Sequence, residues 1–204
     1  VLSELGDVCA SRRSFNNHIG LPLTMLEASC QHHAVILEMG TSSPGEIQRL
    51  ASIARPDFGI VTMIGSGHLA ELVSLEGVAR EKYSMLPHVG AEAWVRNDGF
   101  PLPEGVRAQV HQFGEGQQLA CHEVQCAQNS TSFTLCDGSE FCLPMVGHHH
   151  VVNALPVIAL ARRIGLDDDA IQRGFDQVTP GDGRGVRELI HDISFIDESY
   201  NANP

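Results

Sequence analysis

The chain contains 204 residues, with 13 Lys+Arg against 25 Asp+Glu and a formal net charge of −12. This acidic balance argues against a nucleic-acid polymer as a partner, because phosphate backbones bind clustered basic side chains. A hydrophobic content of 43% with 19% charged residues excludes a disordered chain, and no apolar run approaches the ~18 residues of a membrane span.

Strands and helices alternate in the first half of the chain. Residues 34–40 and 58–64 are apolar runs, which suit parallel strands covered on both faces. The capping-box pattern Ser-Pro-Gly-Glu at 43–46, with Ser43 at the N-cap, predicts a helix over 44–54. A serine also begins the next predicted helix, over 74–86. Such alternation with short links is typical of a parallel α/β sheet.

Residues 99–146 differ from the rest of the chain. Gly and Pro punctuate short alternating runs at 108–113, 119–127, 132–135 and 140–143. This pattern predicts a small antiparallel sheet inserted into the α/β unit.

Helical patterns return after this insertion. A helix is predicted over 151–164, with Pro156 near its first turn, and three aspartates at 167–169 begin another, where they complement the helix dipole. Residues 186–197 predict two strands, the second over 193–197. The expected fold class is therefore α/β, a mainly parallel sheet flanked by helices with an antiparallel insertion.

Two side chains lie at the carboxyl ends of the first two predicted strands, where open α/β sheets bind ligands. Glu38 ends the strand over 34–40, and His68 lies in the loop after the strand over 58–64. A carboxylate and an imidazole at adjacent strand ends suit a divalent metal. Spacing alone favours a hydrogen-bonded glutamate and an exposed loop histidine over a metal pair.

Lys82 is the only lysine in the chain. It follows the i, i+3, i+4, i+7 spacing of a buried stripe formed with Leu75, Val78, Ala79 and Leu86. Burial would lower the pKa of its ammonium group, and a neutral amine can add carbon dioxide to form a carbamate. The alternative is a buried stem with its charged head in water.

Two further patterns could carry chemistry. Of the three histidines at 148–150, we expect one functional residue, because three adjacent side chains cannot face one ion on a regular element. Arg184 lies between glycines, which suits an arginine that reaches a phosphate but also a plain turn.

Lys82 follows Glu81 rather than glycine, so these residues contain no Gly-Lys pair of a phosphate-binding P-loop. The six cysteines form no Cys-x-x-Cys pair, and we expect reduced thiols in a cytoplasmic protein. The chain begins with Val1 and shows no signal-peptide pattern, so we expect it to be a piece of a longer chain.

Together these segments resemble the central domain of the Mur ligase family. The matching segments are 14–24, 34–40, 45–47, 67–69, 74–82, 97–98, 147–153, 183–184 and 197–204. The opening Phe-Asn-Asn-x-Ile-Gly-x-Pro and the closing Ser-Tyr-Asn-Ala-Asn-Pro resemble the members that add D-alanyl-D-alanine to UDP-N-acetylmuramoyl-tripeptide in bacterial peptidoglycan synthesis. The resemblance implies an ATP-dependent ligase that forms an acyl phosphate.

The resemblance also implies roles for individual residues. Glu38, His68 and a carbamylated Lys82 match the residues that hold Mg²⁺, and Lys82, His68 and Arg184 match catalytic positions. The positions that match the ATP-binding side are His149, Asn153, Arg184, Asp197 and Tyr200. Asn16 and Asn17 match a loop that faces the phosphates and the muramyl substrate.

Several features depart from the family pattern. Met63 stands where the family usually has Asn, and His150 replaces the Asn of a Gly-x-His-Asn pattern. The resemblance places the P-loop before Val1, so residues 1–204 would be a truncated central domain without the UDP-binding N-terminal and the C-terminal domains. We expect such a fragment to be inactive alone.

Other functions remain open from the sequence. A folylpolyglutamate or cyanophycin synthetase would share the architecture, although the closing motif at 199–204 argues against both. A non-catalytic binding domain could keep the fold without a P-loop, but the retained Glu38, His68 and Lys82 argue against it. A metal-dependent hydrolase would rest on Glu38 and His68 alone.

Overall fold

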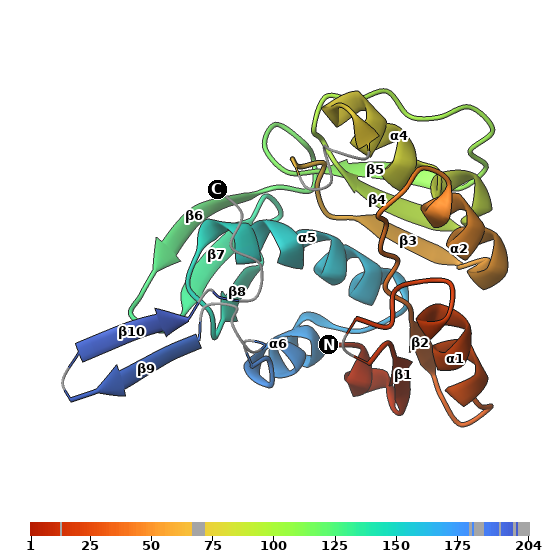
Figure 1. Ribbon diagram of the computed structural model, residues 1–204. Coiled ribbons are helices and arrows are strands. Elements are labelled where there is room, and N and C mark those ends of the chain that lie inside the picture. Colours follow the sequence, from red (N-terminus) through yellow and green to blue (C-terminus); the bar gives the residue numbers. More distant parts are fainter. Residues whose placement is uncertain are drawn as a thin grey trace. The chain divides into compact units, whose positions relative to one another are not determined.

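The computed structural model describes residues 1–12, 14–66, 72–179, 181, 186–191, 193–197 and 199 (Figure 1). Its contacts divide the chain into one compact unit over residues 2–119 and another formed by residue 1 with 120–204. Across the described residues, no helix has the length and apolar character to cross a bilayer.

Parallel strands with intervening helices build the unit over residues 2–119, as the sequence predicts. Its elements are a 3-10 helix η1 (Leu2–Leu5), β1 (Val8–Ala10), α1 (Gly20–Glu27), β2 (Ala34–Ile36), α2 (Glu46–Ala54), β3 (Phe58–Val61), α4 (Leu75–Tyr83), a second 3-10 helix η2 (Leu86–His88), β4 (Glu92–Arg96) and β5 (Gln109–Phe113). Strands β1 and β2 pair in parallel, and β3, β4 and β5 form a three-stranded parallel sheet. Strand β2 is shorter than the predicted strand over 34–40, and its Val35 and Ile36 are exposed rather than covered on both faces.

The placement of β5 corrects the prediction for residues 108–113. Their sequence pattern predicts that they belong to the antiparallel insertion, but β5 pairs in parallel with β4, with Glu92 opposite Gln109 and Arg96 opposite Phe113. The connection over 97–108 is long enough for a parallel crossover, although it contains no helix. Gly and Pro in that connection resemble hairpin punctuation, which explains the wrong prediction.

The apolar core of this unit lies between the three-stranded sheet and the helices α2 and α4. Its fully buried members include Ala51 of α2, Val78 of α4 and Val95 of β4. Ser74 caps α4 as predicted, because its side chain accepts a hydrogen bond from Gly77 N at 3.2 Å. Leu75 departs from the predicted buried stripe and is 41% exposed.

An antiparallel sheet and two helices form the other unit, which confirms the antiparallel part of the predicted fold. Its elements are β6 (Cys121–Cys126), β7 (Thr131–Leu135), β8 (Glu140–Leu143), α5 (His148–Arg163), α6 (Asp168–Asp176), β9 (Val186–Ile190) and β10 (Ile193–Asp197). Helix α5 packs on β6 and β7, and α6 packs on β8. Asp167 caps α6 by accepting from Ala170 N at 2.8 Å.

The start of α5 differs from the prediction. The helix begins at His148 rather than Val151, so the three histidines form its first turn and Pro156 lies inside the helix. Gly147 precedes the helix with φ +135°, a conformation that other residues rarely adopt. The helix start at His148 could not be predicted from the sequence, because the three histidines show no apolar periodicity.

Arg162 joins α5 to the sheet and to α6 through charged hydrogen bonds. Its Nε and Nη2 donate to the two carboxylate oxygens of Asp168, both at 2.7 Å, and its Nη1 donates to Asp137 Oδ2 at 2.6 Å. The hydrogen bond from Arg162 lowers the pKa of Asp168. The backbone N–H of Ser139 and then Arg162 lower the pKa of Asp137.

Replacement of Arg162 by methionine is expected to lower the free energy of unfolding by about 1–2 kcal/mol at neutral pH, since the three side chains are partly exposed. Because both carboxyl pKa values are lowered by folding, this stabilisation is complete above their unfolded pKa and is lost as the pH falls through the folded pKa. Melting temperatures measured between about pH 3 and about pH 7 should therefore converge at the acid end.

The exposed Arg107 offers a control of equal charge change. Arg107→Met should leave the melting curve unchanged, and a gap between wild type and Arg162→Met that persists at acid pH would contradict the assignment.

Candidate functional site

Glu38 lies just beyond the carboxyl end of β2, as the sequence predicts. Its backbone N–H donates to Ser11 Oγ at 3.1 Å, which ties it to the end of the neighbouring strand β1. The Nδ2 of Asn16 donates to Glu38 Oε1 at 2.9 Å, so the structure brings together two of the predicted site residues. The Glu38 side chain is exposed, and its Oε2 has no hydrogen-bond partner in the described part of the chain.

The loop before α1 holds Asn16 and Asn17 in fixed positions. Asn16 O accepts from Gly40 N at 2.8 Å, and a Cβ at Gly40 would lie 2.7 Å from the Asn16 side-chain amide, which would have to move. Asn17 Oδ1 accepts from Ile19 N at 3.0 Å and Gly20 N at 2.9 Å. Asn17 therefore has a local role at the start of α1 that the sequence analysis did not predict.

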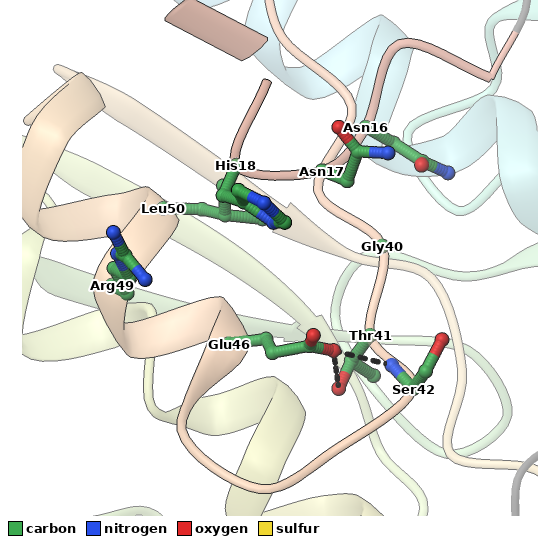
Figure 2. Close-up of a pocket in the computed structure, with 9 residues that line it drawn as sticks. All are labelled: Asn16, Asn17, His18, Gly40, Thr41, Ser42, Glu46, Arg49 and Leu50. Carbon is green, nitrogen blue, oxygen red and sulfur yellow. Dashed lines mark hydrogen bonds between the residues drawn. The ribbon is translucent and has the colours of Figure 1, made fainter. Parts of the chain in front are cut away.

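A polar pocket of about 310 Å³ opens beside these two asparagines (Figure 2). Its lining residues come from the loop before α1, the loop after β2 and the first turns of α2: Asn16, Asn17, His18, Gly40, Thr41, Ser42, Glu46, Arg49 and Leu50. The lining carries amides, hydroxyls, one guanidinium and one carboxylate, which suits a polar ligand.

Glu46 orders the rim of this pocket. Figure 2 shows its carboxylate turned toward Thr41 and Ser42, and Oε2 accepts from Ser42 N at 2.6 Å and Ser43 N at 2.9 Å. These backbone hydrogen bonds lower the pKa of Glu46. The N-cap of α2 is Gly45, with φ +88°, rather than the predicted Ser43. The reciprocal half of the capping box, in which glutamate binds the preceding N–H groups, is nevertheless present.

Lys82 lies in the last turn of α4 and is partly buried. Its Nζ donates to the backbone oxygen of Met63, just past β3, at 2.8 Å. Burial lowers the pKa of Lys82, and the nearby negative charge of Asp98 opposes this shift. The structure therefore supports the predicted burial of the amine, and it directs the amine to the carboxyl end of β3.

Asp98 organises the same region, although the sequence analysis names it only within a motif. One carboxylate oxygen accepts from Ile64 N at 2.7 Å, and the other lies 3.2 Å from Arg96 Nε. Its negative charge also raises the pKa of Tyr83, after burial as the main cause. Asp98 thus holds the backbone beyond β3 close to the Lys82 amine.

Glu81 is a second residue that the sequence analysis did not single out. It precedes Lys82 on α4, is 5% exposed, and its carboxylate accepts hydrogen bonds from the first backbone N–H groups of α2. A charged residue adjacent to an apolar stripe is usually a solvated one, so the helical pattern contained no signal for this contact.

The predicted nucleotide-side residues lie in the unit that contains α5. His149 and Asn153 are exposed and stand four residues apart on α5, so they share one face of the helix. Asp197, at the end of β10, is also exposed, and its Oδ1 accepts from Ser199 N at 3.0 Å. The Ser199 side chain and then its backbone N–H lower the pKa of Asp197. No hydrogen bond links Asp197 to His149 or Asn153 within the described residues.

Three predicted residues, His68, Arg184 and Tyr200, lie outside the described residues. Within the ranges that the structure covers, no three His, Cys, Asp or Glu side chains gather as a metal cluster.

The chain is similar to a well-defined group of proteins. A family model described as the Mur ligase middle domain matches residues 1–161. A UDP-N-acetylmuramoyl-tripeptide–D-alanyl-D-alanine ligase of Synechocystis sp. is 34% identical over 98% of this chain and 44% of its own length. The ligase of the same name from Bacillus subtilis is 34% identical over 94% of this chain and 43% of its length.

The same similarity extends to solved structures. A crystal structure of MurF from Acinetobacter baumannii superposes with a TM-score of 0.89 and 30% identity, over 99% of this chain and 47% of that chain. The present chain thus spans a little under half the length of the relatives that it matches.

Proposed function

This chain belongs to the Mur ligase family, and we propose that it is the middle domain of an ATP-dependent ligase that joins D-alanyl-D-alanine to UDP-N-acetylmuramoyl-tripeptide. The observation that carries the proposal is the 34% identity, over nearly the whole chain, with ligases of that name from two distant bacteria. Such a ligase would act in the bacterial cytoplasm, where its nucleotide substrates are made, and would supply peptidoglycan precursor.

The coverage of the relatives supports a multidomain parent protein. Because the chain matches only 44% of the Synechocystis ligase, we infer that the rest of the activity resides in flanking domains: a UDP-binding N-terminal domain and a C-terminal domain. The P-loop would precede Val1. The antiparallel part of the predicted insertion over 99–146 corresponds to β6, β7 and β8 within this middle domain.

The reaction must bring a peptide carboxylate to the γ-phosphate of ATP, which sets negative charge against negative charge. A bound Mg²⁺ would supply the neutralising charge at that point. Glu38 fits such an ion, because it presents a carboxylate oxygen at the end of a parallel strand while Asn16 holds the other oxygen. We propose Glu38, His68 and carbamylated Lys82 as the protein ligands.

Lys82 has the properties that carbamate formation requires. The neutral lysine amine attacks carbon dioxide, forms an N–C bond and releases a proton. A lowered pKa of the lysine increases the neutral fraction and so favours the reaction. Burial lowers the pKa of Lys82, and the Met63 carbonyl holds its Nζ in place. The product turns a cationic side chain into an anionic oxygen donor, which suits a hard cation.

The substrates are assigned to separate groups of residues. We propose that the pocket beside Asn16 and Asn17 receives the muramyl peptide, since its amides suit polar groups and Arg49 can pair with a carboxylate of the peptide. For ATP we propose the face of α5 with His149 and Asn153, together with Arg184, Asp197 and Tyr200. Arg184 would also act as a catalytic residue, by stabilising charge on the transferred phosphate.

A comparison of acceptors tests the proposal in the full-length protein that contains this chain. With ATP, Mg²⁺ and UDP-N-acetylmuramoyl-tripeptide, phosphate release should depend on D-alanyl-D-alanine and should not occur with glutamate, aspartate or arginine. Release with glutamate on a folate substrate, or with aspartate or arginine on a cyanophycin primer, would identify a related ligase instead. No release with any acceptor would indicate a non-catalytic domain.

A further inference from the structure

Two neighbouring residues of α4 contact two different parts of the proposed site. Lys82 points to the carboxyl end of β3, where its Nζ donates to the Met63 carbonyl oxygen at 2.8 Å. Glu81 points instead to the start of α2 and to the loop that precedes it. A single turn of α4 therefore connects the lysine with a wall of the pocket in Figure 2.

The carboxylate of Glu81 is fully engaged in these contacts. Its Oε2 accepts from Gly45 N at 2.6 Å, and its Oε1 accepts from Ile47 N at 2.8 Å. The Thr41 hydroxyl lies 3.3 Å from Oε1 and shares its proton with Ser43 O at 3.0 Å. The residues are separated by 34 to 40 positions in the chain, so the contact is tertiary. A negative charge at the first turn of a helix also complements the helix dipole.

We propose that Glu81 is a positioning residue that fixes the loop over 41–46 as the wall of the substrate pocket. Glu46 binds the N–H groups of Ser42 and Ser43 within the loop, but the N-cap Gly45 makes no side-chain hydrogen bond. The N–H groups of Gly45 and Ile47 are therefore left to Glu81. Thr41, Ser42 and Glu46 of this loop line the pocket, and two of the three N–H or O–H groups that Glu81 binds belong to the loop itself.

A neutral amide cannot replace this carboxylate. Glutamine offers one acceptor oxygen, so its NH₂ group would face either Gly45 N or Ile47 N, and a buried N–H would lose its partner. Aspartate keeps both oxygens but is shorter by one methylene. Glutamine therefore tests the loss of one acceptor oxygen at constant side-chain length, and aspartate tests a shorter side chain with both acceptor oxygens kept.

The inference rests on the proposed function, and it is tested in the full-length ligase with Glu81→Gln, Glu81→Asp and the control Glu76→Gln. Glu76 lies on the same helix and is exposed, so its replacement makes the same charge change without contact to the loop. The readouts are kcat, the KM values for UDP-N-acetylmuramoyl-tripeptide and ATP, and amide hydrogen exchange of the peptide over 41–50.

Glu81→Gln should raise the KM for UDP-N-acetylmuramoyl-tripeptide about tenfold, while kcat and the KM for ATP stay within about twofold. Its peptide over 41–50 should exchange faster than in wild type, Glu81→Asp should fall between the two, and Glu76→Gln should match wild type. Glu81→Asp, with the charge retained, carries the test if Glu81→Gln does not fold.

If Glu81→Gln left the KM for the muramyl substrate unchanged, the proposal would be overturned. It would also be overturned if kcat fell and both KM values rose to the same extent, together with lower thermal stability. Hydrogen exchange needs no turnover, so it tests the role of Glu81 separately from the proposed ligase function. If the wild-type protein does not use D-alanyl-D-alanine, the proposed function fails. Unchanged exchange over 41–50 in both Glu81 variants overturns the role of Glu81 independently of that result.

Discussion

Replacement of Lys82 by glutamine in the full-length ligase is expected to lower the rate of ligation by about 10²–10³-fold. Glutamine is one atom shorter than lysine, is uncharged and cannot form a carbamate, so the variant lacks the anionic oxygens that we assign to the metal. The expected effect is in kcat, measured by phosphate release at saturating substrates, because the missing group acts on the charge that develops at the phosphate.

A second substitution distinguishes loss of the carbamate from loss of the positive charge of Lys82. Lys82→Arg keeps the positive charge and a donor for the Met63 carbonyl, yet arginine stays protonated and does not form a carbamate. It should be as inactive as Lys82→Gln. Arg80→Gln, on an exposed position of the same helix, should be fully active. A Lys82→Arg variant with wild-type kcat would contradict the carbamate assignment.

Replacement of Glu38 by glutamine is expected to lower kcat by about 100-fold and to raise the Mg²⁺ concentration required for half-maximal rate. The glutamine carbonyl can still accept from Asn16 Nδ2, so the local geometry is kept and only the charge is removed. Initial rates measured across a series of Mg²⁺ concentrations would report both effects.

The exposed Glu104 provides a matched control for Glu38. Glu104→Gln should leave the Mg²⁺ dependence unchanged. If Glu38→Gln had the Mg²⁺ dependence of wild type, Glu38 would not be a metal ligand, and its hydrogen bond with Asn16 would be purely structural.

The sequence predicts those parts of the fold that depend on local patterns. Ser74 caps α4 as expected, since capping depends on residues within one turn, and α6 begins at the aspartates over 167–169 as predicted. The predicted cap at Ser43 is wrong, because Gly45 takes that position. Residues 193–197 form the predicted second strand of a pair. The apolar spacing places Lys82 on the packed side of α4 but leaves open whether its amine is buried, and the structure shows that burial lowers its pKa. Leu75 of the same stripe is exposed.

The remaining features depend on tertiary contacts that periodicity does not contain. The direction of β5 is set by its pairing with β4, and an alternating strand reads the same in either direction. Glu81 binds backbone N–H groups 34 to 36 residues away. Nearly every residue type carries such a group, so the sequence cannot identify these partners. Gly45 is the N-cap of α2, and its N–H donates to the Glu81 carboxylate, a contact that local spacing does not predict.

The fate of the oxygen atoms of the substrate carboxylate tests the proposed chemistry most directly. The full-length ligase would be supplied with ATP, D-alanyl-D-alanine and UDP-N-acetylmuramoyl-tripeptide labelled with ¹⁸O in its terminal carboxylate, and the phosphate and product would be analysed by mass spectrometry. Ligation through an acyl phosphate transfers one ¹⁸O to each phosphate released and leaves the other in the new peptide bond. Phosphate without the label, or release that does not require D-alanyl-D-alanine, would contradict the assignment of this chain to that ligase.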